Sequence, residues 1–109
     1  MADYTVEERG DDAVVAFPEF ADARRTVEDE RILRSLVLSK RRVVFDLTRC
    51  QIVDTPWLRL MTVLSKEADN AGRFVAIAGA SDETKNSTDY LGQRKYLHLY
   101  DGVEDALKS

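Results

Sequence analysis

The run Val43-Val44-Phe45-Asp46-Leu47 restricts most strongly what this chain can fold into. It is nearly continuous in β-branched and aromatic residues, which is typical of a strand in a parallel sheet covered on both faces. A second run of this kind, Phe74 to Ala78, is closed by Gly79. Together the two runs predict a central parallel sheet with helices packed on it.

A segment with helical periodicity separates these two predicted strands. Its apolar residues recur at helical spacing and predict one buried stripe on a helix over residues 56–71. Gly72 follows at the C′ position, where a left-handed backbone costs glycine little. The stripe consists of Trp57, Leu60, Met61, Leu64, Ala68 and Ala71.

Shorter patterns predict the remaining elements. Residues 4–9 and 13–17 predict an N-terminal hairpin that ends before Pro18. Further helices are predicted over 28–39, over 81–91 and over 103–107, and a short strand over 97–100. Ser81 or Asp82 is the expected cap of the 81–91 helix. Residues 20–27 indicate no clear element, and residues 48–54 are predicted to form a loop.

The predicted order of elements is β-β-α-β-α-β-α-β-α. Alternating strands and helices imply parallel pairing through right-handed crossovers, whereas the hairpin supplies an antiparallel N-terminal edge strand. The chain of 109 residues suits one domain, residues 1–109, of the α/β class.

Composition narrows the classes of function. The net charge of −4 argues against nucleic acid as the main partner, because such binders usually carry a basic face. The basic run Lys40-Arg41-Arg42 is interpreted as the solvated C-terminus of a helix. A lone cysteine, Cys50, excludes an internal disulfide and a cysteine-rich zinc site. No apolar run approaches a membrane span and no signal peptide is evident, so a cytoplasmic location is expected.

Thr55 stands where the loop meets the predicted helix at residue 56. Threonine is a preferred N-cap residue, and Pro56 would then occupy the first helical position. Thr55 is therefore either simply a helix cap or a hydroxyl with a functional role. Trp57 is similarly open: it either packs on the sheet with the apolar stripe or projects as an anchor for a partner.

Several segments together resemble STAS domains, the family of the anti-sigma factor antagonists and their relatives. The strand ending in Asp46-Leu47 leads to Asp54-Thr55-x-x-Leu58, which is similar to the family's loop at a helix start. The segment from Ala71 to Gly79 resembles the family's Gly-Gly-strand segment. Leu91-Gly92 and the stretch from Leu97 to Leu107 resemble its closing strand, turn and helix. The motifs cover residues 40–109, and residues 1–40 match in layout only.

The resemblance implies a STAS fold and a non-enzymatic signalling function by partner switching. It implies that the unmodified domain binds an anti-sigma factor that is also a serine/threonine kinase-like ATPase, and that phosphorylation of Thr55 releases it. The phosphate would add about −1.5 to −2 charges beside Asp54. The expected partner-binding residues are Thr48, Arg49, Asp54, Thr55, Pro56, Trp57 and Arg59. No cofactor or metal is expected, and the chain is expected to be a monomer or weak dimer.

Two alternatives remain at this point. One is a stressosome-type scaffold or an accessory STAS subunit of an ABC lipid transporter, without phosphorylation. The other is an enzyme or small-ligand binder built on His98 or Asp46. Asp46 resembles the acceptor of receiver domains, but the acidic pair of such domains is missing, so it is expected to bond loop backbone. His98 is expected to be structural because no catalytic partner is spaced for it.

Ser87 and Thr88 lie near where stressosome relatives carry a second phosphorylation site. Two hydroxyls on a polar helix face are more commonly just solvated, and both interpretations remain open.

Overall fold

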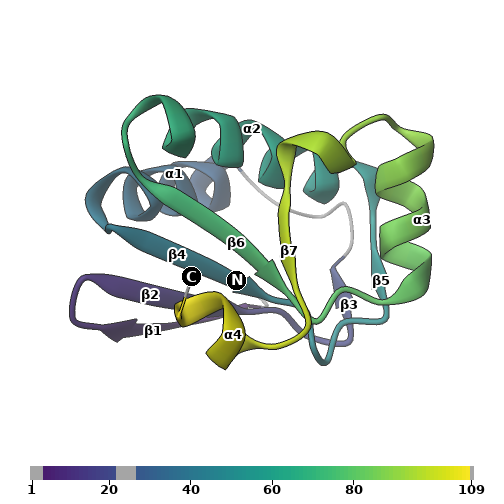
Figure 1. Ribbon diagram of the computed structural model, residues 1–109, viewed down its shortest axis with the longest axis horizontal. Helices are drawn as coiled ribbons and strands as arrows, with labels where there is room; N and C mark the ends of the chain where they lie inside the picture. The colour runs from purple at the N-terminus through teal and green to yellow at the C-terminus, as the bar shows by residue number, and fades with distance from the viewer. Residues whose placement is uncertain (1–3, 22–26, 109) are drawn as a thin grey trace.

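The computed structural model describes residues 4–21 and 27–108, apart from the side chains of residues 20, 21 and 27 (Figure 1). It confirms the α/β class. The elements are β1 (Thr5–Arg9), β2 (Asp12–Ala16), β3 (Phe20–Ala21), α1 (Val27–Ser39), β4 (Arg42–Asp46), β5 (Ile52–Val53), α2 (Thr55–Asn70), β6 (Phe74–Ala78), α3 (Asp82–Tyr90), the 3-10 turn η1 (Arg94–Tyr96), β7 (His98–Tyr100) and α4 (Val103–Leu107).

A five-stranded sheet in the order β1-β2-β4-β6-β7 forms the centre of the fold. β1 pairs with β2 antiparallel, and every other pairing in this sheet is parallel. The predicted antiparallel N-terminal edge is therefore confirmed. A second, two-stranded sheet joins β3 to β5 in parallel.

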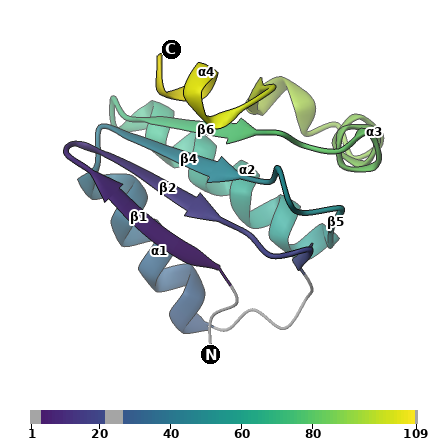
Figure 2. The ribbon, with the colours of Figure 1, turned by 90° about the horizontal axis from the view of Figure 1, so that it is seen from below.

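The two strands of the apolar runs, β4 and β6, are covered on both faces as predicted, by α1 and α2 on one face of the sheet and by α4 on the other, whereas the edge strand β1 is exposed (Figure 2). Val43 and Phe45 of β4 lie in the larger apolar cluster, which α1 and α2 complete. Val44, which points the other way, lies in a smaller cluster with Ala106 of α4. Alternate residues of one strand thus enter two different cores, and a strand in that position needs apolar residues throughout.

α2 ends as its sequence predicts. Gly72 has a φ of 71°, and the Arg73 N–H donates to the carbonyl of Ala68 at 2.7 Å, as in a Schellman motif. Ala71, however, was predicted to belong to the buried stripe and is exposed, because it is the C-cap residue of the helix.

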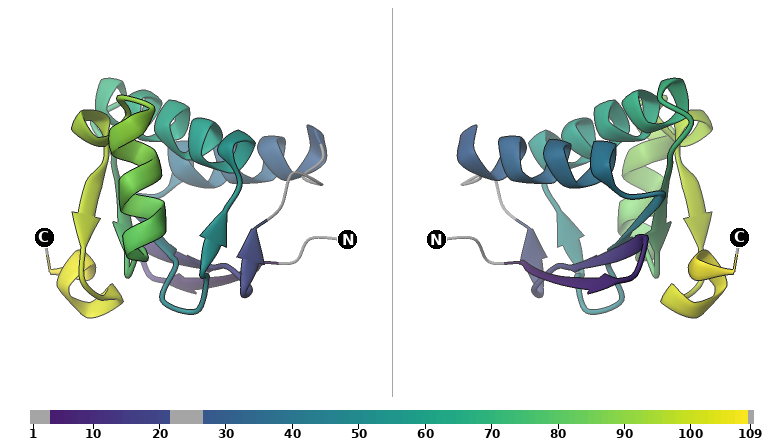
Figure 3. Two further views of the ribbon diagram at one scale, coloured as in Figure 1. Left: turned by 90° about the vertical axis from the view of Figure 1, so that its right-hand side faces the viewer. Right: turned by 90° about the vertical axis from the view of Figure 1, so that its left-hand side faces the viewer.

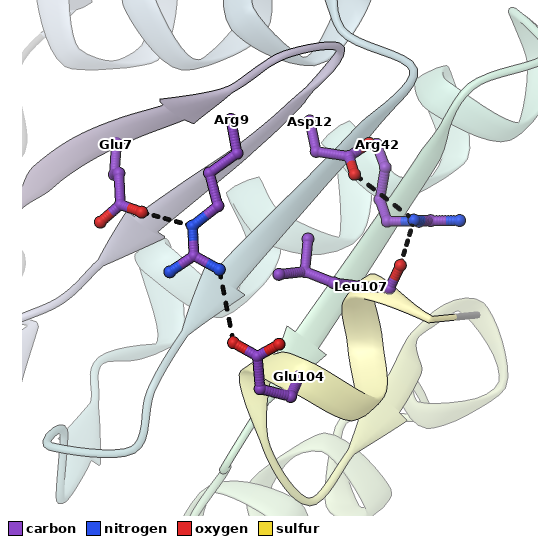
Figure 4. Close-up of polar contacts among 6 residues, drawn as sticks. All are labelled: Glu7, Arg9, Asp12, Arg42, Glu104 and Leu107. Carbon is purple, nitrogen blue, oxygen red and sulfur yellow. Dashed lines mark hydrogen bonds and ion pairs between the residues drawn. The ribbon is translucent and has the colours of Figure 1, made fainter.

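Polar contacts tie the short α4 to the hairpin and to β4 (Figure 4). Arg42 donates to the carbonyl of Leu107 and lies 3.6 Å from Asp12, and both of these charged side chains are mostly buried. Arg9 reaches Glu104 at 3.4 Å. The interpretation of the basic run 40–42 as solvated is therefore wrong for Arg42, which opens β4 and carries the contact to α4.

Candidate functional site

The loop between β4 and β5 begins with a turn fixed by Asp46. One carboxylate oxygen of Asp46 accepts hydrogen bonds from the Thr48 N–H at 2.9 Å and the Thr48 hydroxyl at 2.7 Å. Asp46 thus bonds the loop backbone, as predicted. Gly79, with a φ of 70°, lies against this turn, and a Cβ added there would stand 2.3 Å from Thr48 Cγ2. Thr48 and Gly79 therefore pack so closely that a larger residue at position 79 would force Thr48 to shift.

Gln51 holds the middle of the same loop from two sides. Its N–H donates to the carbonyl of Glu19 at 2.9 Å, next to the β3–β5 pairing. Its own carbonyl accepts from the Ser81 hydroxyl at 2.9 Å. β3, β5 and α3 accordingly lie side by side around the loop (Figure 3, left). The Cys50 thiol is buried and donates to the carbonyl of Ile52 at 3.3 Å, in keeping with an inert role.

α2 begins one residue earlier than predicted. Its N-cap is Asp54, whose backbone is extended and whose carbonyl accepts from the Leu58 N–H at 3.1 Å. Thr55 is the first helical residue, and Pro56 the second. Both aspartate and threonine are good cap residues, and proline is tolerated throughout a first turn, so the sequence could not fix the boundary to one residue.

The Thr55 hydroxyl is consequently not a cap. The Thr55 side chain is exposed. Within residues 4–21 and 27–108, no side-chain hydrogen bond caps α2, and none is formed by the Thr55 hydroxyl. The structural explanation for a threonine at this position is therefore removed, and the hydroxyl remains available at the helix start.

Trp57 packs in the core, which decides the question left open by the sequence. It is 6% exposed. Its ring centroid lies 5.3 Å from that of Phe17 and 6.2 Å from that of Tyr4, and both pairs have edge-to-face geometry. The expectation that Trp57 contacts a partner is therefore corrected, because its ring packs the start of α2 against Phe17 and Tyr4 in the core.

The other predicted binding residues lie at or near the surface. Thr48, Arg49, Thr55 and Arg59 are exposed, whereas Asp54 and Pro56 are half-buried. Thr55 and Arg59 are four residues apart on α2, and such residues lie on the same face of a helix. The structure therefore brings a hydroxyl and a cation together on one exposed face.

A depression beside Thr55 was not foreseen from the sequence. It has a volume of about 420 Å³ and is lined by Thr55 from α2 and by Asn86, Ser87, Tyr90 and Leu91 from the α3 segment. Tyr90 is 90% exposed. The only sequence signal was a tyrosine within an otherwise polar helix.

The two hydroxyls of α3 differ in environment. Ser87 is exposed in the depression, whereas Thr88 is 2% exposed and donates to the carbonyl of Lys85 at 2.7 Å. The interpretation of both as solvated is wrong for Thr88, which faces the interior because α3 packs on the β5 side of the fold.

His98 lies away from this site. Its ring stacks on Phe74 with centroids 4.6 Å apart, and its Nε2 is 3.4 Å from Asp69 Oδ1. Throughout the part of the chain that the structure describes, no cluster of three potential metal ligands occurs. Over the same residues, no helix combines the length and apolarity needed to cross a membrane.

Comparison with known proteins identifies related folds. A family model for the STAS domain matches residues 6–106, whereas a comparison with curated proteins finds no match. The anti-sigma factor antagonist SpoIIAA is similar in its unphosphorylated form (TM-score 0.81, 10% identity, 96% of this chain and 93% of that one). Its phosphorylated form is also similar (TM-score 0.70, 11% identity, 96% of each chain).

Two further solved structures share the fold. An anti-sigma factor antagonist from Mycobacterium paratuberculosis has a TM-score of 0.79 at 19% identity, over 96% of this chain and 90% of that one. The murine anion transporter Slc26a9 in its inward-facing state has a TM-score of 0.63 at 14% identity. The match with the transporter covers 94% of this chain but only 18% of the transporter. At these identities the likeness shows the fold alone.

Proposed function

Because the chain belongs to the STAS domain family, whose model matches residues 6–106, we propose that it is a non-enzymatic signalling module that binds a protein partner through the surface around Thr55. Phosphorylation of Thr55 releases that partner. The partner is an anti-sigma factor of the kinase-like ATPase type, in the cytoplasm. The chain acts as one domain, as a monomer or weak dimer.

One observation carries this proposal: the Thr55 hydroxyl is exposed and has no structural role as a cap. The loop before it is held by Asp46, Gly79 and Ser81, so the hydroxyl is presented from a fixed position. A protein partner or a kinase can therefore reach it without unfolding any part of the domain.

The helix start tolerates a phosphate on Thr55. N–H groups in the first turn and the helix dipole both favour negative charge, although Pro56 supplies no N–H. A phosphate adds about −1.5 to −2 charges next to Asp54. A partner docked on this surface would have to bury that charge, and burial of an uncompensated charge is strongly unfavourable. The phosphate thus acts locally and needs no change of fold.

The test begins with the modification itself. Intact mass and phosphopeptide mapping of the chain from its native cells should locate phosphate on Thr55. Binding to the partner ATPase should then be lost for Thr55→Asp and retained for Thr55→Ala. The charge-matched control is Ser35→Asp, an exposed position within α1. Equal binding of Thr55→Asp and the wild type would contradict the proposal.

A second candidate is a scaffold or an accessory subunit of a transporter, without phosphorylation. The fold shared with the Slc26a9 anion transporter favours it. In that case Thr55 would carry no phosphate under any growth condition, and the chain would co-purify with a transporter component.

A further inference from the structure

We infer that Tyr90 of α3 forms the second half of the partner-binding surface, and that an uncharged side chain of the partner protein occupies the depression between Tyr90 and Thr55. This inference rests on the proposed function, because it names the part of the surface through which the phosphate on Thr55 acts. It assigns a binding role to α3, for which the sequence suggested only a phosphorylation site at Ser87 or Thr88.

The depression is shared between the two helices. Thr55 stands on one side, and Asn86, Ser87 and Tyr90 of α3 stand on the other. A partner docked over the Thr55 hydroxyl would therefore lie directly beside this depression. Tyr90, at 90% exposed, is the most exposed large hydrophobic side chain among the described residues.

Hydrogen bonds hold α3 in place at the side of the depression. The Ser81 hydroxyl accepts from the Thr84 N–H at 3.2 Å and at the same time donates to Gln51 in the loop before Thr55. At the other end of α3, Gly92 has a φ of 69°, and the Gln93 N–H donates to the backbone carbonyl of Thr88 at 2.9 Å. Both ends of α3 are thus capped, and the Ser81–Gln51 bond ties the start of the helix to the loop before Thr55.

Interface size also favours a second half. A stable interface covers about 800 Å² on each partner, whereas of the residues expected around Thr55 only Thr48, Arg49, Thr55 and Arg59 are exposed. A tyrosine contributes about 150–250 Å² when it is covered and is enriched among the residues that dominate binding. Tyr90 supplies this area directly beside the hydroxyl.

The chemistry of the depression defines its occupant. Asn86 and Ser87 offer neutral hydrogen-bonding groups, and Tyr90 and Leu91 offer apolar surface. An uncharged partner side chain with an apolar body fits this lining. A phosphate on Thr55 would bring its charge to the rim of the same space, so that the occupant and the phosphate would compete for it.

Photo-crosslinking in the native cells tests the geometry. The photoreactive residue p-benzoylphenylalanine replaces Arg59 beside Thr55, Tyr90 on α3, or Ile32 on α1 in three separate full-length chains. Ile32 is the control because it is 39% exposed and α1 lies on the other side of α2 from α3 (Figure 1). Positions 59 and 90 should crosslink to one and the same protein, identified by mass spectrometry, and position 32 should not.

Once that protein is purified, its affinity for variants of this chain measures how much Tyr90 contributes to binding. Tyr90→Ala should weaken binding about tenfold or more, as expected for a central aromatic anchor, whereas Ile32→Ala should leave binding unchanged. Tyr90 is exposed, so circular dichroism should show both variants folded.

The outcomes separate this inference from the proposed function. A crosslink from position 59 without one from position 90, or an unchanged affinity of Tyr90→Ala, would overturn the role of Tyr90 and leave the switch at Thr55 standing. Absence of crosslinks from both positions would overturn both.

Discussion

At the scale of single residues, Gly79 determines where the loop before Thr55 can lie. Its left-handed backbone and its close approach to Thr48 act together, since a side chain at this position would be strained and would also collide. Gly10 shares only the first property: its φ is 62°, and nothing lies within 4 Å of an added Cβ.

This pair of glycines gives a matched comparison. Gly10→Ala should cost about 1–2 kcal/mol of the free energy of unfolding, from backbone strain alone. Gly79→Ala should cost about 1–3 kcal/mol more, because Thr48 must also shift. Urea denaturation of both variants measures the difference. Equal losses would mean that the Thr48 contact contributes nothing.

Trp57 is a second residue with a sharp expectation. Its ring packs against Phe17 and Tyr4 in the core, so Trp57→Ala should lower the free energy of unfolding by about 3–5 kcal/mol. Arg59→Ala, two residues further along the same helix but exposed, should change it by less than about 0.5 kcal/mol. A stable Trp57→Ala variant with impaired binding would instead make Trp57 an interface residue.

Tyr4 gives the fold a dependence on alkaline pH. Burial, followed by the nearby carboxylate of Asp29, raises the pKa of Tyr4 to about 12 from 10.0. A raised pKa means that the folded state holds the proton more tightly. The contribution of Tyr4 to the free energy of unfolding is therefore complete below pH 10 and is lost between pH 10 and 12. From pH 9 to 11.5 the wild type should therefore lose more stability than Tyr4→Phe in urea denaturation. Equal losses would contradict this role.

At the scale of elements, α3 depends on Ser81 for two separate contacts. The Ser81 hydroxyl caps the helix and ties it to Gln51. Ser81→Ala should therefore lower stability by about 0.5–2 kcal/mol and should speed amide hydrogen exchange in α3. Ser87→Ala, an exposed change in the same helix, is the control. Unchanged exchange in Ser81→Ala would show that α3 is held by other contacts.

The long elements could be predicted from the sequence because each carries enough residues to display a period. β4, β6, α1 and α2 were all anticipated to within a few residues. β3 and β5 were missed, since a two-residue strand has no detectable alternation and is defined only by its pairing. That pairing joins residues 20–21 to 52–53, and its Phe20–Ala21 strand falls in the segment for which no element was predicted.

The candidate site was predictable in part for the same reason. The position of the loop and the presence of Thr55 follow from local sequence, and the burial of Trp57 agrees with its place on the apolar stripe. The depression beside Tyr90 brings together two helices that are distant along the chain, so no local pattern could indicate it.

At the scale of the whole molecule, the Asp12–Arg42 pair joins the hairpin, β4 and α4 (Figure 4). Both side chains are mostly buried, and without Arg42 the Asp12 carboxylate keeps, among the described residues, only the exposed Arg41, 3.7 Å away, as a charged partner. Arg42→Ala should cost about 3–5 kcal/mol, whereas Arg42→Met with Asp12→Leu should cost much less, because apolar replacements leave no unpaired charge. Equal costs for the single and the double variant would contradict this explanation.

The domain as a whole therefore presents Thr55 after a loop that hydrogen bonds and close packing hold in place. The buried ring of Trp57 packs under the start of α2 in the core, and α3 lines the depression next to Thr55. Under the proposed function, phosphate at this one hydroxyl controls binding. The most direct measurement compares the affinity of the crosslinked partner for the unmodified chain and for the chain carrying phosphothreonine at position 55. Phosphate should weaken binding at least about tenfold, since a charge would be buried. Equal affinities for the two forms would show that phosphate on Thr55 does not control binding.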